Sequence, residues 1–157
     1  MTAKFTEATT MVEVANAELD SLADTHGAIG STVVSNDAST ERNTLANFRV
    51  EIGLQTARSA DAQIHLLIVP DDGAGNYGEV VASDTQTPQS YKARYEDGTY
   101  VVWELDAAVT ARTLTACGVQ VPNGNFKVGL LNDTGQALGA SGISYIYISG
   151  RYGVDDV

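Results

Sequence analysis

Apolar and polar residues alternate along most of this chain, and the alternation predicts β-strands rather than helices. In residues 48–55 every second residue is apolar and the intervening ones are mostly polar or charged, as in a strand with one buried face. Residues 64–69 are apolar on both faces except at His65, which favours a central strand. The pattern predicts strands at residues 48–55, 62–69, 100–105, 126–131 and 143–148.

Turn-forming residues separate the predicted strands at near-regular spacing. Residues 96–99 contain an Asp-Gly pair, which accepts the positive φ angles of a type I′ hairpin turn, and residues 122–125 are a second turn signal. Longer polar loops are expected at residues 35–43 and 83–90, whereas residues 11–23 could hold one short helix or a turn. Roughly eight to ten short strands with these connections predict an all-β, jelly-roll-like β-sandwich, with helix content below about 15%.

The two ends of the chain lack the alternating pattern. Residues 1–10 are polar, Thr-rich and aperiodic, and residues 150–157 close with two aspartates before Val157. Such segments are either frayed termini or short extended arms that lie on a neighbouring subunit. We therefore expect one β-sandwich domain over residues 1–157, with an N-terminal arm at 1–10 and a C-terminal tail at 150–157.

Acidic residues dominate the charge of the chain, because twenty aspartates and glutamates against nine lysines and arginines give a net charge of −11. An acidic surface repels a phosphate backbone, so we expect no nucleic-acid partner. The same charge would suit a partner with a basic patch, or could serve only to keep the protein soluble. No stretch approaches the ~20 apolar residues of a membrane span and residues 1–7 lack an apolar signal core, so we expect cytoplasmic synthesis and no membrane contact.

One segment matches a cofactor motif by its letters. Residues 73–78 read G-x-G-x-x-G after a predicted strand, but a dinucleotide-binding motif must open a helix whose N-terminus holds the pyrophosphate. Residues 79–84 are too short and too β-rich for that helix, and Asp71 and Asp72 would repel the phosphates. We interpret the segment as a Gly-rich hairpin loop and expect no cofactor.

Oxygen-bearing side chains in the same loop raise calcium binding. Asp71, Asp72, Asn76 and Glu79 could supply ligands, since calcium takes six to eight oxygens. The spacing differs from that of an EF-hand loop, and Asp, Asn and Gly are also the residues that tight turns prefer. We therefore assign no metal site, and calcium at Asp71 and Asp72 stays an open alternative.

Side chains suited to catalysis are scarce. Of the two histidines, His26 lies in a turn-like segment and His65 in the most apolar predicted strand, where a core or edge position is expected. The single cysteine, Cys117, lies in a strand-like run and is interpreted as a buried thiol. Neither a G-x-S-x-G motif nor a recognisable metal-ligand spacing is present, so we predict no catalytic, cofactor-binding or metal-binding residues and no enzyme activity.

Aromatic residues raise carbohydrate binding and partner binding. Trp103 alternates with Val101 and Leu105, so we expect its side chain in the core rather than on a sugar-binding platform. Tyr145 and Tyr147 share a face opposite two isoleucines. If the isoleucines face the core, the tyrosines face outward, where paired aromatics often mark an interface. The alternative is that both faces of this strand are covered within the domain.

The pattern near the C-terminus is the most informative motif in the chain. A strand-like run at residues 126–131 leads into N-D-T-G-Q-A-L-G-A-S-G at 132–142 and returns as a strand-like run at 143–148. This order resembles small virion structural proteins of tailed bacteriophages, in which a segment like Asn-x-Thr-Gly-Gln-Ala-Leu-x-Ala-Ser-Gly precedes the last strand. Weaker matches to the same family lie at residues 16–23, 45–50, 66–73 with Tyr77, and 119–127.

The resemblance implies a capsid decoration (cement) protein. Such a protein binds the outer surface of the phage major capsid protein lattice, bridges capsomers and stabilises the head, as a trimer or dimer assembled in the host cytoplasm. The residues expected at the partner interface are Phe5, Met11, Tyr145, Tyr147 and Tyr152. A head-fibre, tail or baseplate component is one alternative, and a carbohydrate-binding module for host glycans is an alternative of another class.

Overall fold

The structure is a computed structural model that describes residues 11–36, 43–53, 57–75, 77, 101–107, 110–140 and 142–153. Several sequence-based predictions therefore lie outside the described residues. They are the N-terminal arm with Phe5, the hairpin at 96–99, the loop at 83–90 and the last four residues of the tail.

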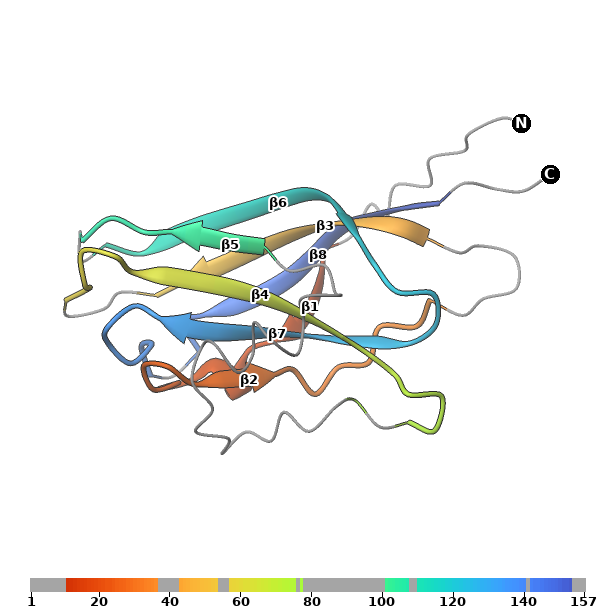
Figure 1. Cartoon of the computed structure of the whole chain (residues 1–157), viewed down its shortest axis with the longest axis horizontal. Helices are drawn as coiled ribbons and strands as arrows, with labels where there is room; N and C mark the ends of the chain where they lie inside the picture. The colour runs from red at the N-terminus through yellow and green to blue at the C-terminus, as the bar shows by residue number, and fades with distance from the viewer. Residues whose placement is uncertain are drawn as a thin grey trace.

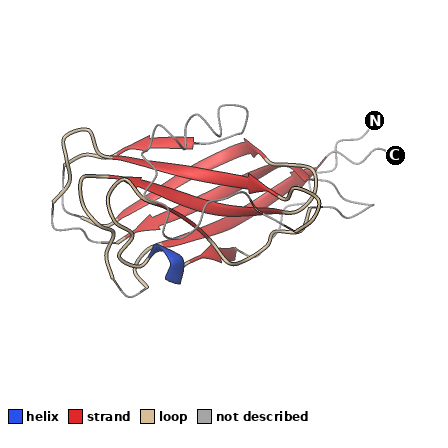
Figure 2. Ribbon diagram, turned by 60° about the horizontal axis from the view of Figure 1, so that its bottom comes forward, coloured by secondary structure: helices blue, strands red, loops and turns tan. Residues whose placement is uncertain are grey.

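Two antiparallel four-stranded sheets pack face to face and form a β-sandwich (Figure 1). The first sheet has the order β1 (Val12–Ala15), β8 (Tyr145–Gly153), β3 (Asn43–Ile52), β6 (Arg112–Gln120). The second has the order β2 (Gly27–Ile29), β7 (Phe126–Asp133), β4 (Gln63–Pro70), β5 (Val101–Glu104). The helical part of the described residues is one short turn, η1 (Ala17–Leu19), drawn in blue in Figure 2. No helix in this part of the chain is long and apolar enough to cross a membrane.

The strand pairing is that of a jelly roll. The pairs β1·β8, β2·β7, β3·β6 and β4·β5 are those of one long hairpin, and the pairs β3·β8 and β4·β7 form where that hairpin rolls up on itself. Consecutive strands consequently lie in opposite sheets, except β4 and β5, which are neighbours. The predicted all-β, jelly-roll-like sandwich is thus confirmed.

The predicted strands all occur, with shifted bounds. β3 begins five residues before the predicted start at residue 48, and β8 runs from 145 to 153 rather than from 143 to 148. The segment at residues 11–23, predicted as one short helix or a turn, holds both β1 and η1. Three-residue β2 is too short to give a periodic signal in the sequence.

The core lies between the sheets and takes its side chains from every second strand position. His65 is 1% exposed but lies on the face of β4 opposite Ile64 and Leu66, so it is buried on the outer face of the sheet rather than in the core between the sheets. The largest fully buried side chains between the sheets include Phe48, Ile52, Ile64, Leu66, Phe126, Leu130 and Ile146. Burying apolar side chains of this size contributes about 1.5–3 kcal/mol each and is the main force that holds the sheets together.

Cys117 is exposed, which corrects the predicted buried thiol. Ala116 and Val119 are both buried although three positions separate them, because β6 carries a bulge between these residues. Gly118 takes the left-handed φ of 67° that the bulge requires, and its N–H donates to Asn47 Oδ1 at 2.8 Å. Cys117 thereby lies on the outer face of the sheet, opposite Ala116.

Trp103 is only partly buried, so its predicted core position holds in part. The indole packs against the core from β5, and its Nε1–H donates to the Thr115 carbonyl of β6 at 3.3 Å. β5 and β6 are edge strands of different sheets, so this bond closes the sandwich along one side. It also occupies a carbonyl that an edge strand would otherwise present to another chain.

Candidate interaction surface

The outer face of the first sheet carries the two tyrosines of β8. Ile146 and Ile148 are 0% and 3% exposed, and Tyr145 and Tyr147 are half-buried on the opposite face, as predicted. The two rings stack with centroids 5.8 Å apart and planes at 21°. The Tyr145 hydroxyl donates to the Gly142 carbonyl, which fixes one ring against the loop that precedes β8.

Charged residues from the two neighbouring strands surround this pair. The register places Glu13 of β1 and Arg49 of β3 on either side of Tyr147, and Glu51 of β3 beside Tyr145. Arg49 Nη2 and Glu51 Oε1 form an ion pair at 2.5 Å. We call Glu13, Arg49, Glu51, Tyr145 and Tyr147 the tyrosine face.

The carboxylates of the tyrosine face act on the hydroxyl of Tyr147. The pKa of Tyr147 is raised above its usual value, first by partial burial and then by the nearby carboxylates of Glu51 and Glu13, while Arg49 opposes the shift. Carboxylates that disfavour a tyrosinate also attract a cation to the same place.

Of the other predicted interface residues, Met11 and Tyr152 lie in the described part of the chain. Met11 is 48% exposed and directly precedes β1, two residues from Glu13. Tyr152 lies on β8 opposite Leu45 of β3.

Arg49 and Glu51 were recognised from the sequence as the polar face of a strand. Their contact with the tyrosines could not be recognised, because the pairing of β3 with β8 joins residues almost a hundred positions apart.

The segment that carries the family resemblance is held by a buried side-chain amide. Asn132 is fully buried, and its Nδ2 donates to the carbonyls of Leu22, at 2.9 Å, and Gln136, at 2.7 Å. The Thr134 hydroxyl donates to Asn132 Oδ1 at 2.8 Å. The Asn and Thr of the N-x-T-G-Q motif therefore shape the turn after β7, so their role is structural.

Two aspartates near the N-terminus hold the same segment from outside. Asp24 Oδ1 accepts the N–H of Gly135 at 2.8 Å, and Asp20 Oδ1 accepts the N–H of Gly142 at 2.7 Å. Both glycines have positive φ, 79° and 65°, which other residues rarely adopt. We call Asp20, Leu22, Asp24, Asn132 and Thr134 the staple.

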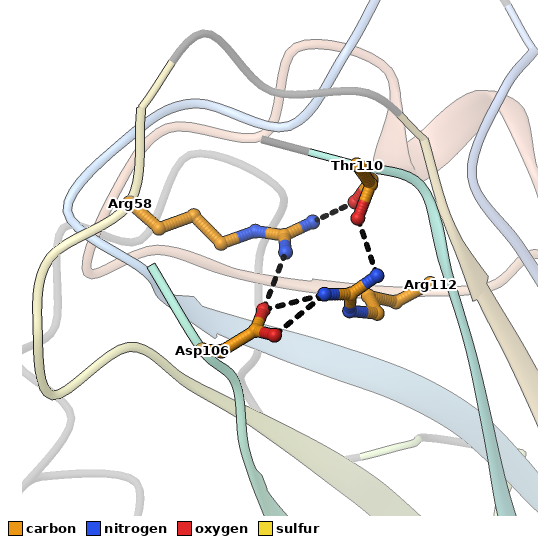
Figure 3. Close-up of polar contacts among 4 residues, drawn as sticks. All are labelled: Arg58, Asp106, Thr110 and Arg112. Atoms are coloured by element: carbon orange, nitrogen blue, oxygen red, sulfur yellow. Dashed lines mark hydrogen bonds and ion pairs between the residues drawn. The ribbon is translucent and has the colours of Figure 1, made fainter. Parts of the chain in front are cut away.

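A second polar cluster joins the loops at the same end of the sandwich (Figure 3). Asp106 accepts two bonds from Arg112 Nη2, at 2.7 and 2.6 Å, and lies 4.0 Å from Nη1 of Arg58. Arg58 Nη2 also donates to the Thr110 carbonyl at 2.8 Å. Burial of the guanidinium and then the charge of Arg112 lower the pKa of Arg58, and Asp106 opposes them. These bonds connect the β3–β4 and β5–β6 loops, so the cluster is a structural clasp.

The Gly-rich loop after β4 is a hydrogen-bonded turn. Asp71 Oδ1 accepts the N–H groups of Gly73, at 2.9 Å, and Gly75, at 2.8 Å, and Asp72 Oδ1 accepts the N–H of Ala74 at 2.8 Å. Residues 71–75 are not helical, in line with the interpretation as a loop. Asn76 and residues 78–79 lie outside the described residues, so the calcium alternative stays untested.

His26 occupies the turn position predicted for it. Its Nδ1 lies 2.8 Å from the Asp24 carbonyl, and its own carbonyl accepts the N–H of Asn132 at 2.9 Å. The imidazole is thus part of the turn next to the staple.

Comparisons with known proteins give no family, and they give several distant structural likenesses. No protein-family model matches the chain, and no curated protein does. The chain is similar to one from Desmodium yellow mottle tymovirus at 14% identity, over 99% of this chain and 89% of that one, with a TM-score of 0.39. It is also similar to one from Mud crab tombus-like virus, at 12% identity, 100% and 92% coverage and a TM-score of 0.38.

The third likeness is to TmCBM61, solved in complex with β-1,4-galactotriose, at 13% identity, 95% and 85% coverage and a TM-score of 0.28. Likenesses at these TM-scores assign neither a function nor a partner. The fold assignment stands on the strand order itself.

Proposed function

We propose that the chain is a virion structural protein of a tailed bacteriophage and, more specifically, a capsid decoration (cement) protein. It binds the outer surface of the major capsid protein lattice, bridges neighbouring capsomers and stabilises the head. The observation that carries this proposal is the resemblance of residues 126–148 to the segment that ends in the last strand of that family.

The staple gives this resemblance a physical basis. The element at residues 16–23 and the segment at 132–142 match the family separately in sequence, and Asp20, Leu22 and Asn132 bond them directly to each other. Two matched segments that form one bonded unit support a shared fold more strongly than two independent matches. The function that the family performs is then the best hypothesis for this chain.

The proposed mechanism is mechanical. We expect a sandwich held at one end by the staple and the clasp to change shape little on binding. The binding free energies of identical contacts repeated over the lattice would then add to the stability of the head. Binding only the expanded lattice stabilises that state by linkage. The proposed contact residues are Phe5, Met11, Tyr145, Tyr147 and Tyr152, and the bound form is a trimer or dimer made in the host cytoplasm.

Re-addition of the purified protein tests this proposal. Particles assembled without the protein should bind it to saturation and release their DNA at a higher temperature afterwards. Unexpanded proheads serve as the control, because linkage to the expanded lattice requires that they bind it more weakly. No saturable binding to either form of the head would contradict the decoration role.

One observation favours a second candidate function. The stacked Tyr145 and Tyr147 pair on an outer sheet face could hold a sugar ring, as in a carbohydrate-binding module. Trp103 does not add to such a platform, since its ring packs on the core from the edge of the other sheet. Binding of host glycans, without binding to particles, would favour this alternative.

A further inference from the structure

The two carboxylates of the tyrosine face, Glu13 and Glu51, differ in their surroundings. Arg49, on one side of Tyr147, forms an ion pair with Glu51. On the other side Glu13 is exposed, and it has no ion-pair partner among the described residues. On the side that faces β1, Tyr147 therefore lies next to a carboxylate that pairs with no cation in the part of the chain that the structure describes.

This combination suits an arginine better than any other side chain. A guanidinium stacks on a tyrosine ring while its N–H groups bond a carboxylate, and both contacts strengthen when water is excluded. Met11, 48% exposed and two residues before Glu13, would cover the stem of an incoming arginine. The carboxylates that raise the pKa of Tyr147 add to the attraction.

We propose that the tyrosine face binds an arginine side chain of a protein partner between the Glu13 carboxylate and the Tyr147 ring. The net charge of −11 argues for a partner with a basic surface and against a second copy of this chain. A neutral glycan would leave the Glu13 charge uncompensated. That the partner is a virion subunit rests on the proposed function, whereas the chemistry of the site does not.

The first experiment measures affinity for particles assembled without the protein. Glu13→Gln and Tyr147→Leu should each weaken binding about fivefold or more, and raising the salt concentration should weaken wild-type binding while affecting Glu13→Gln less. Glu104→Gln is the matched control, since Glu104 is exposed on the opposite sheet, and it should bind like wild type. Far-UV spectra should show that all three variants fold. If wild type binds and both site variants bind equally well, the inference is wrong.

The second experiment needs no particle. The probe is the peptide acetyl-Gly-Arg-Gly-amide, titrated into the full chain and followed by the ring resonances of Tyr147, with the neutral citrulline peptide as control. Shifts with the arginine peptide that are absent with citrulline and lost in Glu13→Gln would support the site, even if wild type fails to bind particles and the decoration role falls. Equal responses to the two peptides would overturn the inference, whatever the particles show.

Discussion

The side chain of Asn132 donates to two backbone carbonyls and accepts the hydroxyl of Thr134 in a fully buried position. An apolar residue here would leave the carbonyls of Leu22 and Gln136 without those donors in a place with little access to water. The motif letters N-x-T thus follow from a local hydrogen-bonding need. The sequence shows the N-x-T motif but not the hydrogen bond from Asn132 to Leu22, because these two residues lie 110 positions apart.

Asn132→Ala should lower the free energy of unfolding by about 2–3 kcal/mol, because buried acceptors lose their donors and a small cavity opens. The measurement is urea denaturation followed by tryptophan fluorescence. Asn123→Ala, in the exposed turn between β6 and β7, is the matched control and should change stability by less than about 0.5 kcal/mol. Equal effects of the two substitutions would show that the staple contributes nothing to stability.

Glu18 should make the stability depend on acid pH. Burial disfavours its charge, but a hydrogen bond from the Ser31 side chain outweighs burial together with backbone N–H groups, among them those of Asn16, at 3.2 Å, and Ser31, at 2.8 Å, and the pKa of Glu18 lies below the usual 4.5. A lowered pKa contributes stability that is complete above that usual value and is lost as the pH falls through the folded-state pKa. Glu18→Gln should therefore flatten the fall in melting temperature below about pH 4.5, and an unchanged slope would contradict this assignment.

Alternation along the chain predicts which residues share a face, but not always which face is buried. On β8 the outward position of the tyrosines was one of two open alternatives. The apolar neighbours of His65 on β4 indicated that it is buried, but not that it lies on the outer face of the sheet. Cys117 was placed wrongly because a bulge at Gly118 changes the phase of β6 and a small thiol fits either face. The position of Trp103 was predicted only in part. Its ring packs against the core but stays partly exposed, and its hydrogen bond to Thr115 requires that β5 and β6, in different sheets, lie close together.

At the scale of elements, the strands were predictable because their periodicity is local. Their partners were not, since jelly-roll pairing joins strands from opposite ends of the chain, as β1 with β8. For that reason only part of the tyrosine face could be predicted. The two tyrosines can be recognised within one strand, whereas Glu13 and Arg49 lie beside them only because β1 and β3 pair with β8. The clasp was missed completely, because Arg58, Asp106 and Thr110 lie in loops without any pattern and Arg112 stands at the very start of β6.

The clasp should stabilise the connections β3–β4 and β5–β6. Asp106→Asn removes the one carboxylate shared by Arg58 and Arg112 and leaves two neighbouring guanidinium groups, one of them with a fully buried side chain. Because the Asp106 side chain is 61% exposed, water offsets part of the loss, and we expect a cost of about 1–2 kcal/mol. Asp61→Asn, exposed in the neighbouring β3–β4 loop, is the control. Equal denaturation midpoints for the two variants would rule out this role.

At the scale of the whole molecule, the staple and the clasp lie at the same end of the sandwich, where β3, β5 and β7 end and β4, β6 and β8 begin (Figure 1). A backbone bond between Ser59 and Thr134, at 2.9 Å, connects the two networks. The tyrosine face lies on the outside of a sheet held in this way. An outer face with two tyrosine rings, two carboxylates and one arginine fits the docking on a basic surface that we propose.

The central claim is that this chain decorates a phage head, and a cryo-EM map of the virion tests it most directly. If the chain decorates the head, the map should show density for the jelly roll on the outer surface of the major capsid protein lattice, in fixed stoichiometry to that protein. The tyrosine face should be turned toward the lattice. A map in which the jelly roll occurs only in the tail, baseplate or head fibre, or is absent from the particle, would contradict it.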